Sequence, residues 1–406
     1  METFVATTRA HAEALDRADP LAPFRERFVI ADPDLVYLDG NSLGRLPRAT
    51  AERLERLVAD EWGAELIRAW DHWLELPTRV GDLLATTLLG ARRGEVILAD
   101  SATVNFHRLA SAALDARPGR RVIVTDRANF PTDRYVLEGI ARARGLEIRW
   151  LEPRPDGGPE PIEVAAALDE RVALVTLCHV DYRSAAIADM GAITALAHDA
   201  GALTLWDCCH SIGAIPVELR RSAADLAVGC TYKYLNAGPG APAFLYVRDE
   251  LQDEIRNPIQ GWFGQRDQFA MGPTYDPLPG IAGWLVGTPP VLGLAAVEEG
   301  IRLATEAGID GIRRKGVALT GYAIELFDAW LADAGFRLGS PREAERRGSH
   351  VSLLRADAED LTRSLIASGV VPDFRPPDGI RLGLSPLTTR FTDVWDGLSR
   401  LRQMVG

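Results

Sequence analysis

The chain has 406 residues, of which 47% are hydrophobic and 25% charged, proportions typical of a globular protein with one large and one smaller domain. Its 45 Lys and Arg against 57 Asp and Glu give a net charge of -12, which argues against a polyanion-binding surface and hence against nucleic acid as a partner. No stretch approaches the roughly 20 apolar residues of a membrane span, and residues 1–4 lack the features of a secretory signal. We expect a cytoplasmic protein that does not bind membranes.

Short apolar runs alternate with helical patterns from about residue 95 to 250. The predicted strands cover residues 96–99, 121–124, 147–150, 172–177, 203–206, 226–229 and 244–247. Helices are predicted between them, for example over 132–144 and 190–200. Continuous apolar strands separated by helices are typical of a mostly parallel sheet covered on both faces, so the predicted fold class is α/β. In such sheets ligands bind beyond the carboxyl ends of the strands.

The pattern changes after residue 290 to long helices, predicted over 291–306 and 311–334, then short strand-like runs and a final helix over 391–404. These elements predict a smaller α+β domain over residues 291–406, beside a large domain over 46–290, with residues 1–45 packing on the smaller domain. The irregular connection 257–290 is rich in Gly, Pro and Trp. Irregular segments of this length are usually functional or interface-forming.

The chain contains only two lysines, Lys233 and Lys315, and the other 43 basic residues are arginines. Guanidinium stays protonated, so it cannot replace an amine that must attack a carbonyl. Lys315 lies in a charged helical run, where we expect a solvated side chain. Lys233 is flanked by apolar and aromatic residues and is therefore the candidate catalytic lysine.

An aspartate stands at the carboxyl end of the predicted strand 203–206. Asp207 precedes His210 by three residues and Lys233 by 26. Pyridoxal 5′-phosphate (PLP) requires a lysine that bonds its aldehyde and an acidic group that keeps its pyridine nitrogen protonated. A lone Asp in this position is usually a helix N-cap, but the pairing with Lys233 favours a PLP site.

A phosphate-binding segment is predicted after the strand 96–99. The run 100–105 opens a helix that continues to about residue 113, and Thr103 with the adjacent amides could hold phosphate oxygens. A plain helix cap is the alternative interpretation. Phe130, in the segment 129–133, either stacks on a cofactor ring or fills the core.

The cysteines and histidines show no metal-binding spacing, so we predict no metal. Buried reduced thiols are expected at Cys178, Cys208, Cys209 and Cys230.

Several motifs together resemble kynureninase, a PLP enzyme of the aspartate aminotransferase fold (fold type I). They are Tyr-Leu-Asp-Gly-Asn-Ser-Leu-Gly at 37–44, Asn-Phe-Pro-Thr-Asp at 129–133, Gly-Cys-Thr-Tyr-Lys-Tyr-Leu-Asn-Ala-Gly-Pro-Gly at 229–240, Gly-Trp-Phe-Gly at 261–264, Gly-Thr-Pro-Pro at 287–290, Gly-Ile-Arg at 379–381 and Arg-Phe-Thr-Asp-Val-Trp at 390–395. The Thr-Tyr-Lys-Tyr-Leu-Asn block is specific, and the other motifs support it. The likeness spans nearly the whole chain.

The resemblance implies a role for each matching residue. Lys233 would be the Schiff-base lysine, Asp207 would face the pyridine nitrogen, and His210 and Phe130 would lie against the ring. Arg381 would bind the substrate α-carboxylate, which suits a planar guanidinium. The residues implied around the phosphate are Ala102, Thr103, Tyr232, Trp262 and Thr288, and those implied near the substrate, besides Arg381, are Asn41 and Trp70. For Trp70, packing within an N-terminal helix is the alternative interpretation. The resemblance also implies a homodimer with active sites at the subunit interface.

Five departures from the family pattern fall near these motifs. Cys178 replaces Ser or Thr, Asp181 replaces Asn, Cys208-Cys209 replaces Leu-Ala, Gln265 replaces His and Thr388 replaces Tyr. Cofactor chemistry is expected to survive these changes, whereas substrate identity is less firmly specified.

The leading hypothesis is PLP-dependent hydrolysis of L-kynurenine, or a ring-substituted relative, to an anthranilate and L-alanine. Tyr232 is a candidate proton relay as well as a candidate phosphate ligand. At Gly287 and Thr288 the chain resembles bacterial members of the family that favour unsubstituted kynurenine, rather than members with Ser-Asn there that favour the 3-hydroxy compound, so the resemblance implies the unsubstituted substrate. Two alternatives stay open: an aminotransferase or other lyase of the same fold, and a degenerate PLP-binding regulatory module. Cysteine desulfuration is disfavoured, because no cysteine follows Cys230.

Overall fold

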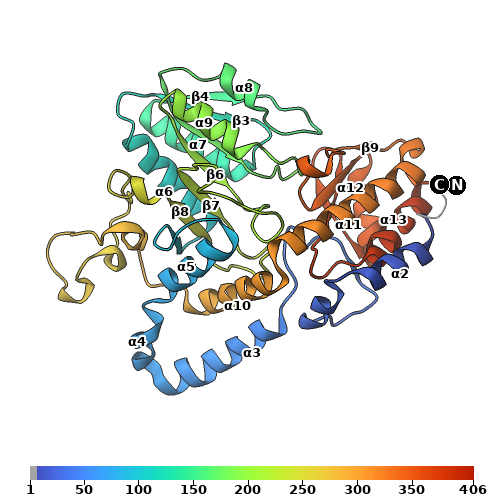
Figure 1. Cartoon of the computed structure of the whole chain (residues 1–406), viewed down its shortest axis with the longest axis horizontal. Helices are drawn as coiled ribbons and strands as arrows, with labels where there is room; N and C mark the ends of the chain where they lie inside the picture. The colour runs from blue at the N-terminus through green and yellow to red at the C-terminus, as the bar shows by residue number, and fades with distance from the viewer. Residues whose placement is uncertain (1–6) are drawn as a thin grey trace.

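The computed structural model describes residues 7–406, which are built around a seven-stranded sheet (Figure 1). In sheet order the strands are β2 (Val96–Leu98), β8 (Phe244–Val247), β7 (Leu226–Gly229), β6 (Leu203–Asp207), β5 (Val172–Cys178), β3 (Val122–Asp126) and β4 (Glu147–Leu151). Within this sheet β8 runs antiparallel to both neighbours, and the other strands share one direction. All seven predicted strands and the α/β fold class are confirmed.

Helices cover both faces of the sheet, which explains why its strands read as continuous apolar runs. One face packs on α6 (Ala102–Asp115) and α7 (Pro131–Arg144). The other face packs on α5 (Leu76–Leu88), α8 (Pro161–Ala166), α9 (Met190–Asp199) and α10 (Val291–Ala307). The predicted helices are confirmed within a few residues at either end, and α7 begins at Pro131 because proline is favoured in the first helical position.

A second region contains a four-stranded antiparallel sheet, shown at the right of Figure 1. Its strands, in sheet order, are β12 (Asp373–Arg375), β13 (Gly379–Gly383), β10 (His350–Leu354) and β9 (Arg337–Leu338). Its helices are α11 (Ile309–Trp330), α12 (Ala358–Ala367) and α13 (Phe391–Val405), with 3-10 turns η8 (Ala332–Ala334) and η9 (Ala344–Arg346).

The N-terminal segment lies against this second region. Helix α2 (Arg9–Ala18) packs on α13, and Asp16 accepts a hydrogen bond from the Phe391 backbone N–H at 2.6 Å. After turn η1 (Ala22–Arg27), strand β1 (Val36–Tyr37) pairs in parallel with β11 (Val370–Val371). The domain boundaries at residues 45 and 290 stay a prediction.

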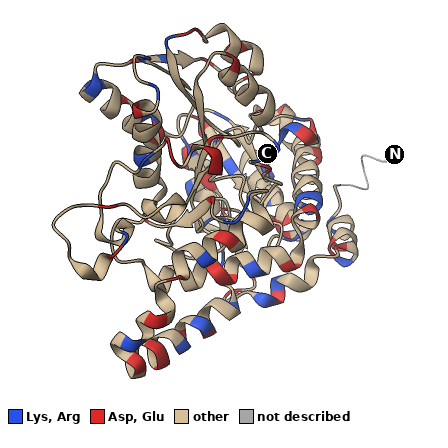
Figure 2. Ribbon diagram, turned by 60° about the vertical axis from the view of Figure 1, so that its left-hand side comes forward, with Lys and Arg blue, Asp and Glu red and all other residues tan. Residues whose placement is uncertain are grey.

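A helical arm projects at the lower edge of the molecule (Figure 1). It comprises α3 (Arg48–Arg56), the π-helix η2 (Leu57–Glu65), η3 (Leu66–Ala69) and α4 (Trp70–Trp73). Basic and acidic residues are interspersed along it (Figure 2). Large apolar side chains nevertheless stand exposed at its tip, namely Val58, Trp62, Leu66 and Ile67. None of the described helices is both long and apolar enough to cross a membrane.

The irregular connection 257–290 also exposes apolar side chains. It contains the short turns η5 (Trp262–Gly264), η6 (Gln268–Ala270) and η7 (Gly280–Trp284), and it follows η4 (Asp249–Leu251). Phe263 and Trp284 are buried against the sheet, whereas Trp262, Phe269 and Met271 are 43%, 64% and 72% exposed. Part of the connection therefore belongs to the core, and another part presents apolar side chains at the surface.

The expectation of a solvated Lys315 is wrong. Its side chain is 6% exposed, and Nζ lies 2.6 Å from Asp19 Oδ2, whose side chain is 5% exposed. Helical periodicity placed Lys315 on a charged face, but the N-terminal segment covers that face and supplies the counter-ion. This ion pair joins α11 to the residues that follow α2.

Breaking this buried pair should destabilise the protein, because the remaining charge would be left without its partner. We expect Lys315→Met and Asp19→Asn each to lower the free energy of unfolding by about 3 kcal/mol. The double variant should cost less than the sum of the two. Arg363→Ala, which removes a pair exposed on both sides, serves as control and should change stability by less than about 0.5 kcal/mol. Urea unfolding measures all four; additive costs at positions 19 and 315 would contradict a direct pair.

Candidate active site

Four neighbouring parallel strands end at the same edge of the large sheet, and each is followed by a polar side chain. In sheet order, β7 leads to Lys233, β6 ends at Asp207, β5 ends at Cys178, and β3 leads to Asn129. Cys178 and Asp207 lie directly opposite each other in the strand register. The topology therefore gathers side chains that are up to 104 residues apart in sequence.

Lys233 is buried beside two rings. Its Nζ lies 3.3 Å from Nε2 of His210 and 5.8 Å from the centre of the Phe130 ring. Burial, together with the charge on Lys233, lowers the pKa of His210 well below its ordinary value, so the imidazole is neutral. Among the described residues Lys233 makes no ion pair with a carboxylate, so its amine is not committed to a structural salt bridge.

The loop that carries Lys233 is fixed by the N-terminal segment. The Gly44 N–H donates to the Tyr232 carbonyl at 2.8 Å. A Cβ at position 44 would stand 2.3 Å from the carbonyl oxygen of Lys233, so only glycine permits this approach. The position of the amine therefore depends on a segment almost 190 residues earlier in the chain.

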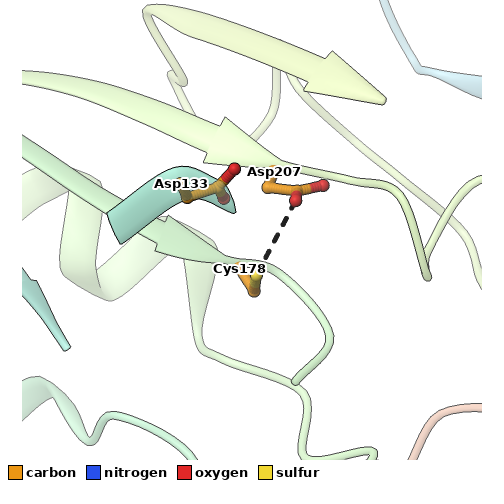
Figure 3. Close-up of side chains that lie close together, drawn as sticks. All are labelled: Asp133, Cys178 and Asp207. Carbon is orange, nitrogen blue, oxygen red and sulfur yellow. Dashed lines mark hydrogen bonds between the residues drawn. The ribbon is translucent and has the colours of Figure 1, made fainter. Parts of the chain in front are cut away.

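Asp207 has a second carboxyl group beside it, on Asp133 (Figure 3). The Cys209 N–H donates to Asp207 Oδ1 at 2.6 Å, and Cys178 Sγ lies 3.8 Å from Oδ2. Burial, together with the charge of Asp207, raises the pKa of Asp133 well above its ordinary value. Asp133 therefore binds a proton more readily than an isolated carboxyl group, because a second buried charge beside Asp207 is unfavourable.

Asp133, Cys178 and Asp207 also have ligand atoms within 4.8 Å of one another, close enough for a metal ion. Burial raises the pKa of Cys178 well above its ordinary value, and a protonated thiol is a poor metal ligand. The expectation of no metal stays a prediction.

Arg381, on β13, is buried and held by groups from three segments. It donates to the Tyr182 carbonyl (2.7 Å), to Ser42 Oγ (2.9 Å) and to Asp373 Oδ2 (2.5 Å). The Asn41 side chain accepts from Arg381 Nε at 2.9 Å. The Tyr182 ring in turn packs edge-on against Phe130, with 5.3 Å between ring centres. Because Phe130 lies beside Lys233, Tyr182 and Phe130 are the two residues that connect Arg381 to Lys233.

The candidate phosphate residues fall into two groups. Ala102 and Thr103 open helix α6 at the same sheet edge, behind the N-cap Ser101, and Thr103 is exposed. Trp262 and Thr288 are exposed too, but among the described residues neither has a hydrogen bond or ring contact with Lys233 or His210. Tyr232 is half-buried next to Lys233.

Trp70 lies away from this cluster within the described chain. Its ring packs on Trp73 and Phe263, with ring centres 5.5 and 6.2 Å apart. Phe263 is the neighbour of Trp262, so Trp70 stands next to the exposed apolar part of the connection 257–290. This position is compatible with either of the two interpretations given for it.

Three residues of the cluster were not assigned a role from the sequence. Asp133 could have been found, because it follows β3 and so belongs to the same sheet edge as Asp207. Asp373 and His350 come from the smaller sheet, whose strands carry no comparable signal. The His350 ring is fully buried 5.7 Å from the His210 ring, and neither of its nitrogens has a side-chain partner.

Two family models match the chain: "Kynureninase C-terminal domain" over residues 312–401 and "DegT/DnrJ/EryC1/StrS aminotransferase family" over residues 87–223. The kynureninase of Pseudomonas fluorescens is 44% identical over 98% of this chain and 96% of its own. That of Burkholderia pseudomallei strain 1106a is 44% identical over 98% of this chain and 95% of its own. The chain belongs to the kynureninase family. The resemblance drawn from the motifs is thereby confirmed.

Solved structures confirm the PLP fold type I architecture expected of a kynureninase. A cysteine desulfurase from Thermococcus onnurineus NA1 has a TM-score of 0.80 at 18% identity, covering 97% of this chain and 98% of its own. A C-DES variant with glycine covalently linked to its PLP cofactor has a TM-score of 0.79 at 17% identity, covering 91% and 97%. At such identities the likeness shows the fold and not the reaction.

The departures from the kynureninase pattern differ in where they fall. Asp181 accepts from the Arg183 and Ser184 N–H groups, and so holds a turn. Gln265 accepts from the Asp276 N–H and ties the two halves of the connection 257–290. Thr388 is buried, and its carbonyl accepts from Arg25. Cys178 and Cys209, by contrast, lie against Asp207.

The raised pKa of Asp133 gives a spectroscopic prediction. Because burial and the charge of Asp207 raise the pKa of Asp133, we expect it to hold a proton at pH 7, and infrared difference spectra should contain a carboxylic-acid C=O band that Asp133→Asn removes. Asn keeps the shape and neutrality of the protonated acid, so stability at pH 7 should change by less than about 1 kcal/mol. A missing band at pH 7 in the parent protein would show that both carboxyl groups are ionised.

Proposed function

We propose that this chain hydrolyses L-kynurenine, or a close ring-substituted relative, to an anthranilate and L-alanine, with PLP as its cofactor. The observation that carries the proposal is the buried Lys233 amine, free of any ion pair in the described chain, beside a carboxylate pair at the next strand end. The 44% identity to kynureninases over almost the whole chain supports the substrate class.

The residues present fit the cofactor. Lys233 offers an amine for the aldehyde, and the centre of the Phe130 ring lies 5.8 Å from that amine. Asp207 would supply a negative charge that complements a protonated pyridine nitrogen, and the raised pKa of Asp133 favours a proton on the carboxyl group beside it. The N-terminus of α6, with the exposed Thr103, is suited to a phosphate. When bound, PLP would store in its ring the electron pair left on the substrate Cα.

The protein groups would then divide the remaining work. Lys233 would hold the cofactor through its amine, and its Nζ would take and hold the proton from the substrate Cα. Arg381 would bind the α-carboxylate. The hydrogen bonds from Arg381 to Ser42 and the Tyr182 carbonyl fix the guanidinium, and Asp373 balances its charge until a substrate carboxylate competes for it.

Tyr232 keeps its two candidate roles, phosphate ligand and proton relay. Burial raises the pKa of its hydroxyl above the ordinary value, so the group is a donor at neutral pH. The preference for unsubstituted kynurenine stays a prediction, based on Gly287 and Thr288, and so does the cytoplasmic location.

The function is tested with the two lysines as a matched pair. The purified protein should show a PLP absorbance band and release fluorescent anthranilate from L-kynurenine, with a higher kcat/KM than for the 3-hydroxy compound. Lys233→Arg keeps the charge but not the nucleophile, and should lose at least about 10³-fold in kcat. Lys315→Arg preserves the structural ion pair and should retain activity.

Three outcomes would contradict the proposal in different ways. A PLP-loaded protein that turns over neither kynurenine nor ring-substituted kynurenines would contradict the substrate. Accumulation of pyridoxamine phosphate and a keto acid would favour transamination. Absence of any cofactor band would favour the regulatory module.

The proposal includes a homodimer with shared active sites. Support comes from apolar side chains that one chain leaves exposed on the connection 257–290 and on the helical arm; Trp262 is 43% and Ile67 76% exposed. Contiguous apolar surface of this kind marks association sites. A two-fold interface would bring Trp262 and Thr288 to the phosphate site of the other subunit.

Trp262→Ala should therefore weaken both association and PLP retention. A buried interface tryptophan is worth about 2 kcal/mol or more, so the dimer dissociation constant should rise at least about 10-fold. Light scattering measures the dimer, and dialysis followed by absorbance measures PLP loss. Tyr135→Ala, which removes an exposed aromatic ring on α7 (65% exposed), is the control. An active, PLP-loaded monomer at micromolar concentration would contradict the shared site.

A further inference from the structure

Two cysteines continue the register of strands β6 and β7 beyond the ends of the strands. Asp207 lies opposite Val228, and the Cys208 N–H donates to the Val228 carbonyl at 2.7 Å. Continuing this register places Cys209 opposite Cys230. Neighbouring strands lie about 4.8 Å apart, which falls within the Cα separation of about 4.4–6.8 Å that a disulfide requires.

The side chains of this pair already contact each other's backbone. The Cys230 N–H donates to Cys209 Sγ at 3.2 Å, and Cys230 Sγ lies 3.9 Å from the Cys209 carbonyl oxygen. The β-ladder thus ends in a sulfur contact where the next backbone hydrogen bond would be.

The two thiols also differ in acidity. Burial raises the pKa of Cys230, but the hydrogen bond from Cys209 and the nearby charge of Lys233 outweigh it, and the net pKa is below the ordinary value. The same hydrogen bond, with burial, raises the pKa of Cys209. One thiol is therefore poised as a nucleophile and the other as its proton donor, an arrangement suited to redox exchange.

The other two cysteines lack these features. Cys178 lies 3.0 Å from Asn129 Oδ1, and Cys208 packs in the apolar core. Burial raises the pKa of both thiols well above the ordinary value. Among the described residues neither contacts another sulfur, so they are expected to stay reduced and unreactive.

We propose that Cys209 and Cys230 are a redox-active dithiol that a peroxide converts into a reversible disulfide at the edge of the active site. The Cys230 sulfur attacks one peroxide oxygen; an S–O bond forms, the O–O bond breaks, and the leaving hydroxide takes a proton to become water. The Cys209 sulfur then attacks the Cys230 sulfur; the S–S bond forms, and the hydroxyl leaves with the Cys209 proton as a second water. Two thiols lose two electrons, hydrogen peroxide gains them, and a dithiol reductant reverses the change.

The disulfide would act on the site through the two loops that it ties together. Cys209 supplies the N–H that Asp207 accepts, and Cys230 precedes Tyr232 and Lys233 in the neighbouring loop. Pulling the sulfurs to bonding distance would shift Asp207 relative to Lys233. A displacement of about 1 Å at a reacting group costs roughly 10²-fold in rate, so the oxidised form should be strongly impaired.

The bond itself is tested without any assay of catalysis. The PLP-loaded protein is treated with hydrogen peroxide, alkylated, and digested with trypsin, which places Cys208 and Cys209 on the peptide 184–220 and Cys230 on the peptide 222–233. We expect these two peptides to be joined, and free thiols to fall from the four of the reduced protein to two. Fragment spectra, or the variant Cys208→Ala, assign the bond to Cys209.

Matched variants connect the bond to function. Cys209→Ala, which restores the residue that the family pattern has there, keeps the backbone N–H to Asp207 and should be resistant to peroxide. Cys208→Ala should remain sensitive, and dithiothreitol should restore its activity. No joined peptide in the parent protein would overturn the proposal. If peroxide lowered the activity of Cys209→Ala as much as that of the parent protein, the disulfide would not cause the loss. The oxidation that inactivates the protein would then lie at another residue.

The outcome is separable from the proposed function. The joined peptide depends only on the two thiols, whereas the loss of activity depends on the reaction proposed for Lys233. A disulfide in a protein that does not cleave kynurenine would leave the redox pair standing and remove only the proposed reaction.

Discussion

The site depends on one buried anion, Asp207. A carboxylate removed from water must be compensated by hydrogen bonds and opposite charge. Here the compensation comes from four directions: the Cys209 N–H at 2.6 Å, the Cys178 thiol, the Asp133 carboxyl group, whose pKa is raised, and the charge of Lys233. Each donor follows a different strand or opens a different helix. The parallel order β7-β6-β5-β3 places all of these groups at one edge of the sheet. The fold therefore determines the charge balance of the site.

A second constraint links this edge to the smaller sheet. The segment around β1 touches both: the Gly44 N–H bonds to the Tyr232 carbonyl beside Lys233, and the Asn41 side chain bonds to Arg381. At Gly383, two residues after Arg381, a Cβ would meet the Asn41 side-chain amide at 1.8 Å, so only glycine permits this approach. The distance between the amine and the guanidinium is therefore set by a short N-terminal segment. This segment contains the motif at 37–44. Its contacts with both sheets involve residues far away in sequence, so local sequence patterns could not reveal them.

What the sequence could predict follows from how local each signal is. The seven strands were found because buried parallel strands are apolar along their whole length, and Lys233 because lysine is otherwise almost missing. Lys315 was placed wrongly because its counter-ion, Asp19, is almost 300 residues away in sequence. His350 gave no signal for the same reason, because the His210 ring beside it comes from the edge of the other sheet. Asp373 gave none because its partner Arg381 lies on the neighbouring strand of its own sheet, and only the strand register brings the two together. The Asp207–Lys233 pairing could be inferred because the two residues follow adjacent strands, which the chain order already suggests.

Sulfur replaces other atoms at two of the positions that contact Asp207, and the two replacements act in opposite directions. At Cys178 a thiol stands where the family pattern has a hydroxyl, and a thiol is the weaker hydrogen-bond donor. Its single S–H has Asn129 Oδ1 as the nearer acceptor at 3.0 Å, and Asp207 Oδ2 lies 3.8 Å away, so the thiol neutralises the carboxylate only weakly and more of the negative charge stays available to a cation at this edge. At Cys209 the sulfur replaces a methyl group and leaves the backbone donor unchanged, so it adds reactivity without altering the hydrogen bond. The cysteine at position 178 therefore adjusts the negative electrostatic potential that Asp207 creates at the sheet edge. The cysteine at position 209 instead makes the position of Asp207 sensitive to oxidation.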